Sequence, residues 1–348
     1  MNKKEYRRIL IIEVNWLGDV LFSTPFIRSV RGKFKDAHIA CLTVPRTVEI
    51  LEGNPNINEI IIYDENSKHK SFLGKARLIR SLRRKRFDLV IILHRSFTRA
   101  IIAFLSGIRE RIGYATKKRR FLLTRPVEIP DKVLHKVDYF LGIAGFLGCD
   151  TSNRRYEFFV TENDRVNAKR KLEENGVKNG DFLVILNPGG NWMPKRWNAK
   201  NFAGLADILI DKYKAKIIIT GAEKDITLAR EIKGMMKNDA AILAGRTNLK
   251  ELGATAEMAD FFISGDTGPS HIAVAMGCNA ILLYGPTSPL LTGPYGNGNY
   301  TVVQKNTSCE VPCYDLQCDD YRCMDEISVN DVLSAFEDMY KNAQNRKV

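Results

Sequence analysis

Residues 264–273 form a short stretch whose residue types can hold a phosphate group. Two glycines allow a tight turn, and Pro269 suits the first position of a helix. The free N–H groups at such a helix start, with the hydroxyls of Thr267 and Ser270, can bind phosphate oxygens, and His271 can donate to the same ligand. The stretch is neither a G-x-G-x-x-G fingerprint nor a P-loop, so a nucleotide would be held by a different arrangement. An ordinary capped turn, with His271 in the core, is an equally good explanation.

Two other loops carry charged side chains that suit the same ligand. Residues 187–197 combine two glycines, two of the three tryptophans and the pair Lys195–Arg196, and a lysine here is a natural counter-charge for a diphosphate. The alternative is a surface loop whose tryptophans pack at a domain edge. Past another apolar run, Glu223 or Asp225 can accept ribose hydroxyls, although Asp225 can instead cap the next helix.

Residues 15–25, near the start of the chain, carry a candidate general base. Asp19 follows Gly18 at the beginning of a predicted helix. A carboxylate in this place can take a proton from a bound hydroxyl. The spacing alone favours the common structural use, in which an acidic residue caps the helix or interacts with its dipole.

The charge of the chain is concentrated in its first half. The 348 residues carry a net charge of +13. Residues 1–150 contain 29 Lys+Arg and 15 Asp+Glu, a net of +14, and the rest therefore has a net of −1. Basic clusters lie at residues 83–86 and 117–120. This asymmetry predicts an anionic partner for the first half, which can be a nucleic acid, an anionic lipid surface or an acidic substrate; each cluster alone is explained by a solvated face.

Four of the seven cysteines, Cys309, Cys313, Cys318 and Cys323, fall within fifteen residues. Such a cluster suggests a structural metal more than disulfides, but it lacks the paired C-x-x-C spacing of common zinc sites. Thiols in a loop, free or paired, are the alternative. No apolar run approaches the roughly 20 residues of a membrane span, and the charged residues 1–8 do not resemble a signal peptide. We therefore expect a cytoplasmic protein.

Two α/β domains are needed to position these loops, because apolar runs alternate with amphipathic ones along the whole chain. The pattern predicts a doubly wound parallel sheet in each domain, with a linker at residues 148–155 and ligand loops at the carboxyl ends of the strands. Strands are predicted at residues 8–14, 38–44, 59–63, 87–93, 111–114, 182–186, 216–220, 241–243, 260–264 and 280–284. Helices are predicted from about residue 18 to 34 and at residues 46–51, 75–84, 96–105, 133–147, 162–174, 198–213, 226–236, 249–258, 272–276 and 329–342.

These motifs together resemble glycosyltransferase family 9, the ADP-heptose:lipopolysaccharide heptosyltransferases, and within it the heptosyltransferase II branch. The resemblance rests on the sequence NWLGDVL at residues 15–21, NPGG at 187–190 with KRW at 195–197, Gly221 with Glu223 and Asp225, and GDTGPSH at 265–271. It covers nearly the whole chain in order. The cysteine cluster also looks like a loop that heptosyltransferase II-like members carry.

The resemblance implies a GT-B fold, in which two Rossmann-like domains face each other across a cleft. It implies an acceptor-binding domain at residues 1–150, a donor-binding domain at 151–326 and a C-terminal helix and tail at 327–348. The reaction would be an inverting, metal-independent transfer from ADP-heptose, without a cofactor. By resemblance Asp19 is the base, and the donor is held by Lys195, Glu223, Asp266, Thr267, Gly268 and His271.

The implied acceptor is the phosphorylated, Kdo-bearing inner core on lipid A, and it agrees with the basic first half. We expect Arg95, Arg99 and Arg120 to bind it, and the basic half permits contact with the cytoplasmic face of the inner membrane. A related enzyme that uses another nucleotide sugar is one alternative. A nucleotide-sensing protein with a basic anion-binding domain is another. Nucleic acid is not expected, because aromatic residues for base stacking are not interleaved with the basic ones.

Overall fold

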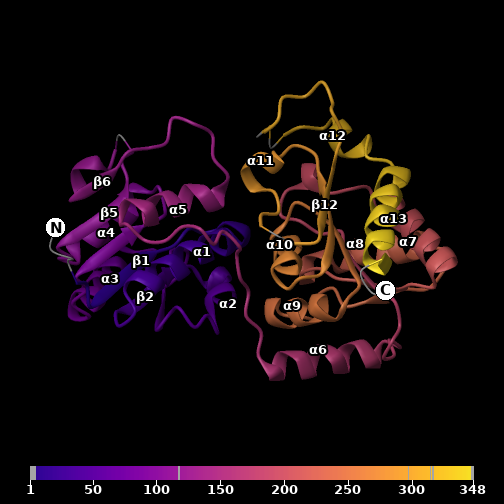
Figure 1. Ribbon diagram of the computed structural model, residues 1–348, viewed down its shortest axis with the longest axis horizontal. Helices are drawn as coiled ribbons and strands as arrows, with labels where there is room; N and C mark the ends of the chain where they lie inside the picture. The colour runs from indigo at the N-terminus through magenta and orange to yellow at the C-terminus, as the bar shows by residue number, and fades with distance from the viewer. Residues whose placement is uncertain (1–4, 117, 297, 314, 316, 346–348) are drawn as a thin grey trace. The chain divides into compact units, whose positions relative to one another are not determined.

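The chain divides into two compact units, Met1–Phe159 and Val160–Val348. The computed structural model describes residues 5–116, 118–296, 298–313, 315 and 317–345. Residues 1–4 of the charged N-terminal segment and Lys117 of the second basic cluster lie outside the described residues. Figure 1 shows the elements of both units in their chain order.

The first unit is built on a six-stranded sheet in the order β3-β2-β1-β4-β5-β6. Every neighbouring pair of strands is parallel. The chain therefore starts in the middle, builds outward to β3 and then crosses back to β4, which is the doubly wound order. The strands are β1 (Arg8–Ile12), β2 (His38–Thr43), β3 (Glu59–Ile62), β4 (Leu89–Ile92), β5 (Glu110–Tyr114) and β6 (Arg125–Val127).

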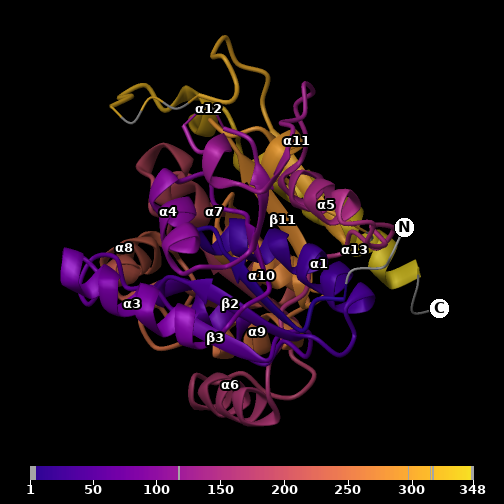
Figure 2. The ribbon, with the colours of Figure 1, turned by 90° about the vertical axis from the view of Figure 1, so that its left-hand side faces the viewer.

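Helices cover both faces of this sheet because alternate residues of each buried strand point to opposite sides. Leu10 and Ile12 of β1 pack with α3 and α4, which lie side by side (Figures 1 and 2). The longer α1 packs against α5. The helices are α1 (Leu17–Lys33), α2 (Val48–Leu51), α3 (Phe72–Arg84), α4 (Phe97–Leu105) and α5 (Lys136–Phe146), with short 3-10 turns η1 (Pro45–Thr47) and η2 (Arg120–Leu122).

The second unit repeats this winding with its own six parallel strands, in the order β12-β11-β10-β7-β8-β9. Read outward from its first strand, β7, the sheet has the same doubly wound order as the first unit. The strands are β7 (Leu183–Asn187), β8 (Lys216–Ile219), β9 (Ala241–Ile242), β10 (Phe261–Gly265), β11 (Asn279–Tyr284) and β12 (Tyr300–Gln304).

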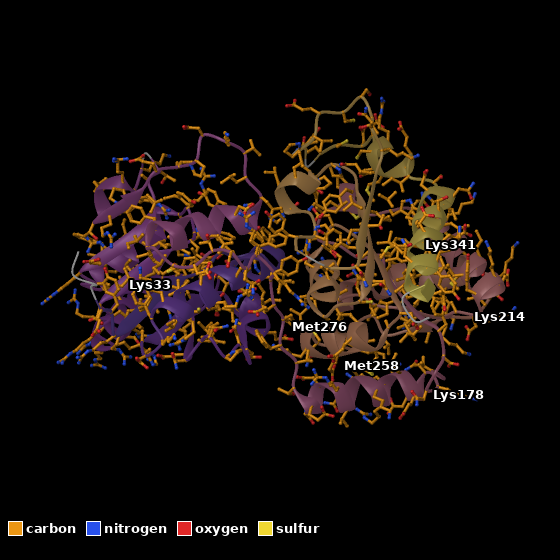
Figure 3. All side chains as sticks on the ribbon, in the orientation of Figure 1. Lys33, Lys178, Lys214, Met258, Met276 and Lys341 are labelled. Atoms are coloured by element: carbon orange, nitrogen blue, oxygen red, sulfur yellow. The ribbon has the colours of Figure 1, made fainter. Side chains whose placement is uncertain are left out.

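The helices of the second unit again form two layers. Val184 and Leu186 of β7 pack with residues of α7, α8 and α13, whereas Ile185 between them packs with residues of α9 and α10. Lys178, Lys214 and Lys341 are exposed on the surface (Figure 3). The elements are α6 (Glu162–Glu174), α7 (Ala199–Tyr213), α8 (Ile226–Met235), α9 (Leu249–Met258), α10 (Gly268–Ala275), α11 (Pro289–Thr292), α12 (Arg322–Asp325), α13 (Val329–Asn345), η3 (Met193–Lys195) and η4 (Glu223–Asp225).

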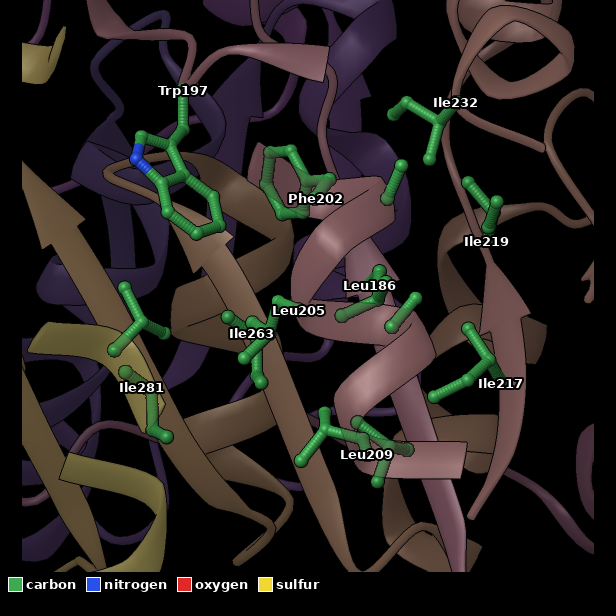
Figure 4. Packing of buried hydrophobic residues seen from close by; sticks show 14 of the residues in the cluster. Leu186, Trp197, Phe202, Leu205, Leu209, Ile217, Ile219, Ile232, Ile263 and Ile281 are labelled. Atoms are coloured by element: carbon green, nitrogen blue, oxygen red, sulfur yellow. The ribbon is translucent and has the colours of Figure 1, made fainter. Parts of the chain in front are cut away.

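One tryptophan of the loop at residues 187–197 belongs to the larger core of this unit. Trp197 is 2% exposed and stacks edge-on against Phe202 of α7, with 5.0 Å between ring centroids. Figure 4 shows it above Leu205 and Ile263 in the same cluster. Its indole N–H donates to the carbonyl of Ile327 at 2.7 Å, which ties the loop to the segment before α13. The role of Trp197 is therefore packing.

The predicted linker at residues 148–155 and the segment that follows it both belong to the first unit. Arg28 of α1 pairs with Glu157 at 2.7 Å and donates to the carbonyls of Asn153 and Arg155 at 2.9 Å. The ring of Tyr156 packs edge-on against Phe22. These contacts extend the first unit to Phe159, beyond residue 150. Among the described residues, no helix is both long enough and apolar enough to cross a bilayer.

Candidate active site

The two central strands of the second unit bring two of the predicted loops together. β7 and β10 pair in parallel, with Ser264 opposite Asn187, so both end at the same edge of the sheet. The chain leaves β7 toward β8 and β9, whereas β10 belongs to the other half of the sheet. A crevice outside the carboxyl ends of strands at such a reversal point is the usual ligand position in doubly wound folds.

A row of buried polar side chains fixes these strand ends. The hydroxyl of Thr220 donates to Asn187 Oδ1 at 3.1 Å, and the amide of Asn187 donates to the Ser264 hydroxyl at 3.2 Å. Ser264 in turn donates to the carbonyl of Asn187 at 2.9 Å. Because these groups satisfy one another inside the protein, the three loops that follow β7, β8 and β10 start from defined positions.

Asp266, the first residue after β10, is the centre of an ion-pair network. Its carboxylate lies 2.7 Å from Lys195 Nζ and accepts from His271 Nε2 at 3.3 Å, and the hydroxyl of Tyr284 lies 3.2 Å from Oδ1. Burial alone would raise the pKa of Asp266, but the hydrogen bond from His271 and the charge of Lys195 outweigh it and hold the pKa well below its usual range. Asp266 is therefore ionised at neutral pH and positions Lys195 and His271.

The loop that carries Lys195 lies directly against the turn after β10. A Cβ on Gly265 would lie 2.7 Å from the carbonyl oxygen of Lys195, so glycine is required at this close approach. Lys195 keeps 23% of its side chain exposed and lies over the ring of Trp192, 5.8 Å from the centroid. In the described part of the chain, the indole N–H of Trp192 is buried without a hydrogen-bond partner. Lys195 is thus partly accessible to a ligand at this edge of the sheet.

Arg196 and Asp225 contact the two glycines of the same loop, Gly189 and Gly190. Arg196 donates to the carbonyl of Gly190 at 2.5 and 3.1 Å and lies 3.5 Å from Asp225 Oδ1. A Cβ on Gly189 would lie 2.3 Å from Asp225 Oδ2, so a larger residue here would force the Asp225 side chain to move. Asp225 is buried and accepts from the amide of Ala222 at 3.0 Å, which caps η4. Glu223, by contrast, is exposed.

The start of α10 presents backbone donors at this edge. Thr267 precedes the helix with extended backbone, and Ser270 accepts from its amide at 3.3 Å while donating to its carbonyl at 2.7 Å. The first amides of a helix have no acceptor within the helix and carry the positive end of its dipole. Gly268 leaves this helix end without a side chain. Lys195, Thr267 and Gly268 thus lie at one sheet edge with a charge and hydrogen-bond pattern that suits a phosphate.

In the first unit, Asp19 lies in the first turn of α1, after β1. Its side chain is 20% exposed, and Lys136 at the start of α5 has its Nζ 3.9 Å from Oδ1. β1 and β4 are neighbours and also belong to opposite halves of their sheet, so Asp19 lies at the equivalent reversal point. The position is suitable for a base that takes a proton from a bound hydroxyl.

A second carboxyl group, Glu13, lies beneath this turn and was missed by the sequence analysis. Glu13 is 1% exposed, and burial raises its pKa to about 8. The hydroxyl of Ser23 lies 3.0 Å from Glu13 Oε2 and 2.7 Å from the carbonyl of Val20, so one hydroxyl proton cannot serve both. A protonated Glu13 that donates to Ser23 resolves this geometry. The signal in the sequence that could have identified Glu13 was its position at the end of an apolar strand.

The three arginines expected to bind the acceptor are placed differently. Arg95 is exposed, and Arg120 is exposed and paired with Glu128 at 2.7 Å. Arg99 is 3% exposed, donates to Asn15 Oδ1 at 3.0 Å and lies 4.0 Å above the ring of Tyr63. Arg99 therefore positions the loop before Asp19, whereas Arg95 and Arg120 are accessible.

Two further basic groups lie at this edge: Arg119 of the basic cluster at residues 117–120, whose burial was not predicted, and His94, which was missed. Arg119 is fully buried and donates to the carbonyls of Tyr114 and His94; burial lowers its pKa to about 10. His94 follows β4, and burial together with the charges of Arg99 and Arg119 lowers its pKa to about 4. The imidazole is therefore neutral at pH 7. The signal in the sequence that could have identified His94 was its position directly after a predicted buried strand.

The four clustered cysteines all carry free thiols. Cys323 is buried, and burial, with smaller contributions from the other three cysteines, raises its pKa to about 11. Within the described ranges, no group of three or more His, Cys, Asp or Glu side chains is arranged to hold a metal ion. The metal content of this cluster stays a prediction.

Two doubly wound units in series, each built on a parallel six-stranded sheet, are the architecture of the GT-B fold. The model of glycosyltransferase family 9 (heptosyltransferase) matches residues 75–320, and the chain belongs to this family. It is therefore a glycosyltransferase.

Similar proteins span nearly the whole chain. Lipopolysaccharide heptosyltransferase 3 of Escherichia coli is 27% identical over 92% of this chain and 95% of its own length. Lipooligosaccharide heptosyltransferase 2 of Campylobacter jejuni is 26% identical over 97% and 99%. Among solved structures, a family 9 glycosyltransferase from Veillonella parvula has a TM-score of 0.89 with 27% identity and coverage of 96% and 97%. The ADP-heptose lipopolysaccharide heptosyltransferase II of E. coli has the same fold, with a TM-score of 0.80 at 22% identity over 97% and 99%.

Proposed function

We propose that this protein transfers heptose from ADP-heptose to the inner core of a lipopolysaccharide, with inversion at the anomeric carbon. Membership of the heptosyltransferase family supports the sugar. The names of the relatives, which are lipopolysaccharide and lipooligosaccharide heptosyltransferases, support the acceptor class. The observation that carries the proposal is the network of Lys195, Asp266 and His271 at the start of α10, because it holds the Lys195 ammonium group in place beside the first amides of that helix.

In this proposal the second unit binds the donor. The diphosphate lies against Lys195 Nζ and the first amides of α10, next to Thr267 and Gly268, while Asp266 and His271 hold the lysine and the turn in place. Exposed Glu223 accepts hydrogen bonds from the ribose hydroxyls. When the bond to the sugar breaks, negative charge grows on the departing ADP, and these fixed donors stabilise it more than they stabilise the ground state.

The first unit supplies the base and binds the acceptor. Asp19 takes the proton from the acceptor hydroxyl as that oxygen attacks the anomeric carbon, and the proton stays on the Asp19 carboxyl until solvent removes it. The pKa of an ordinary aspartic acid is low for a base. Proton transfer can follow bond cleavage in an oxocarbenium-like transition state, so a weak base suffices. Arg95 and Arg120 are accessible to the anionic groups of the inner core.

The acceptor carries lipid A, so the proposed reaction takes place at the cytoplasmic face of the inner membrane. The excess of basic residues in the first half supports such a peripheral contact.

A transfer assay with ADP-heptose and defined inner-core acceptors tests the proposal. Heptose transfer with an inverted anomeric configuration is the expected result. Turnover with UDP- or GDP-sugars, and none with ADP-heptose, would contradict it and favour a related enzyme with another donor. Nucleotide binding without any glycosyl transfer would favour a sensing protein.

A further inference from the structure

Helix α3 of the first unit has an outer face on which positive charge accumulates. Residues 66–87, which include this helix, contain nine Lys and Arg and no Asp or Glu. Leu78 and Leu82 are buried against the sheet, and Arg77, Arg80 and Arg84 are exposed on the opposite side, at the spacing of one helix face. In the described part of the chain, none of these three arginines forms an ion pair or a side-chain hydrogen bond.

Two large apolar side chains lie at the beginning of the same helix. Phe72 is 85% exposed and Leu73 is 67% exposed. Leu73 precedes Arg77, Arg80 and Arg84 by four, seven and eleven residues, so it lies on the same face. We call Phe72, Leu73, Arg77, Arg80 and Arg84 the α3 face. Adjacent exposed side chains of this size cost free energy in water and indicate a partner that covers them.

The arginines of the α3 face also line a hollow suited to an anionic headgroup. The hollow has a volume of about 440 Å³ and is lined by Arg77, Arg80, Ser81, Arg84 and Lys85. All of these side chains can donate hydrogen bonds, and no carboxylate is among them. A guanidinium group can donate two parallel hydrogen bonds to two oxygens of one phosphate, so the hollow suits the phosphate of a phospholipid.

We propose that the α3 face docks the protein on an anionic phospholipid bilayer, with Phe72 and Leu73 in the interfacial layer and the arginines on headgroup phosphates. Cations beside exposed apolar residues are the pattern of a helix that lies on a membrane surface. Nucleic acid would use the arginines but would leave Phe72 and Leu73 without a role, because neither side chain is part of a stacking array. The inference rests on the proposed function in one respect, since the lipid-linked acceptor gives membrane contact its purpose.

Co-sedimentation with vesicles tests the proposal on the full chain. Wild type is expected to bind vesicles of phosphatidylcholine and phosphatidylglycerol in equal parts and to stay in solution with phosphatidylcholine alone. R77Q/R80Q/R84Q should lower the partition coefficient by roughly a hundredfold, and F72S/L73S by at least roughly tenfold. High salt should weaken the binding of wild type and of F72S/L73S.

Matched variants of the second unit control for charge and surface hydrophobicity. K169Q/R170Q/K178Q removes the same charge from three exposed positions, and V166S/M235S removes exposed apolar side chains; Lys178 is labelled in Figure 3. Both controls should bind vesicles like wild type. An equal loss of vesicle binding in the charge control would overturn the proposal. Vesicle binding by F72S/L73S at the wild-type level, together with displacement of the vesicles by RNA, would also overturn it.

Transfer to a de-acylated, water-soluble acceptor separates this inference from the proposed function. The α3-face variants should keep wild-type turnover with that acceptor and lose it preferentially with acceptor embedded in vesicles. If wild type transfers no heptose to either acceptor but the vesicle results hold, the proposed function fails and the membrane surface stands. Unchanged turnover of the variants on embedded acceptor, with unchanged vesicle binding, would refute the surface alone.

Discussion

Lys195 and Asp266 meet across the ends of two neighbouring strands, with 2.7 Å between Nζ and Oδ2. One residue lies in the loop after β7 and the other follows β10, so the ion pair joins the two halves of the second sheet at its reversal point. The pair keeps a flexible lysine side chain in one place before any ligand arrives. In the proposed function, this preorganisation lowers the entropic cost of binding the diphosphate.

Replacing Lys195 tests its role toward the donor. Lys195→Ala removes the ammonium group from the proposed diphosphate site and should weaken the binding of ADP and of ADP-heptose by a similar factor, roughly 10- to 100-fold. Calorimetric titration of both ligands measures this. Lys200→Ala removes an exposed lysine from the first turn of α7 and should leave both affinities unchanged. ADP affinity of Lys195→Ala at the wild-type level would remove the lysine from the diphosphate site.

Replacing Asp266 tests the network from its acidic side. The pKa of Asp266 is lowered on folding, so its ionised form stabilises the fold. This contribution is complete above the ordinary pKa of 3.8 and is lost as the pH falls through the lowered pKa of the folded state. Asp266→Asn should therefore lower the unfolding free energy at pH 7 by about 1–3 kcal/mol and reduce its fall below pH 3.8. Urea titrations across this pH range measure the unfolding free energy of both proteins. An equal loss of stability in acid in wild type and Asp266→Asn would contradict the stabilising role of the ionised Asp266.

Asp19 is tested by separating binding from chemistry. Asp19→Ala should reduce kcat by roughly 100- to 10,000-fold and leave the affinity for ADP-heptose near wild type, because the proposed base touches the acceptor and not the donor. Single-turnover kinetics with calorimetry measure the two effects. Asp36→Ala, at an exposed turn position after α1, is the matched control. Substantial transfer by Asp19→Ala would mean that another group accepts the proton.

Buried Glu13 predicts a pH dependence of stability with the opposite sign. Its pKa is raised from 4.5 to about 8 on folding, so the folded chain binds a proton that the unfolded chain releases between these values. The free energy of unfolding should therefore fall as the pH rises from 4.5 to about 8. The fall is at most about 1.4 kcal/mol for each unit by which the pKa is raised. Glu13→Gln should match wild type near pH 4.5 and exceed its stability at pH 8. A melting temperature with the same pH profile in both proteins would show that Glu13 does not carry this dependence.

The arginines of the first unit should separate into two groups. Arg95→Ala and Arg120→Ala should raise the KM for a phosphorylated acceptor without changing the melting temperature, because both side chains are exposed. Arg99→Met should destabilise the fold by about 1–3 kcal/mol, since it leaves Asn15 and Glu65 without their buried partner. Kinetics with acceptors that carry or lack phosphate, and thermal unfolding, measure the two responses. A large loss of stability in Arg95→Ala would contradict this division.

Much of the fold could be predicted because hydrophobic periodicity is a local property of the sequence. Helices 162–174 and 249–258 and strand 216–220 lie within a residue of their observed bounds. The edge strands β6 and β12 were missed: β6 has three residues and contains Pro126, and β12 is partly exposed, so neither has the continuous apolar run of a central strand. The winding of both sheets followed from the alternation of strands and helices.

The site was predicted less completely because side-chain pairing is a property of the folded chain. The sequence identified the loops, and the rule for strand ends placed them at one edge. It did not distinguish Arg99, which is buried against Tyr63, from Arg95, which is exposed. It assigned Gly265 to a tight turn and did not predict the close approach of the Lys195 carbonyl, which also requires glycine at this position. Burial and close backbone approach depend on residues distant in the sequence, so periodicity cannot report them.

The repeated winding of the two sheets has a consequence for how such an enzyme can diversify. Each unit has a hydrophobic interior of its own and a reversal point of its own in the strand order. In the proposed function, substitutions that recognise a new acceptor can therefore accumulate in the first unit without disturbing donor binding in the second. Chimeras that join the first unit of one relative to the second unit of another should fold, and they offer a direct way to assign sugar-donor and acceptor preference to separate halves of the gene.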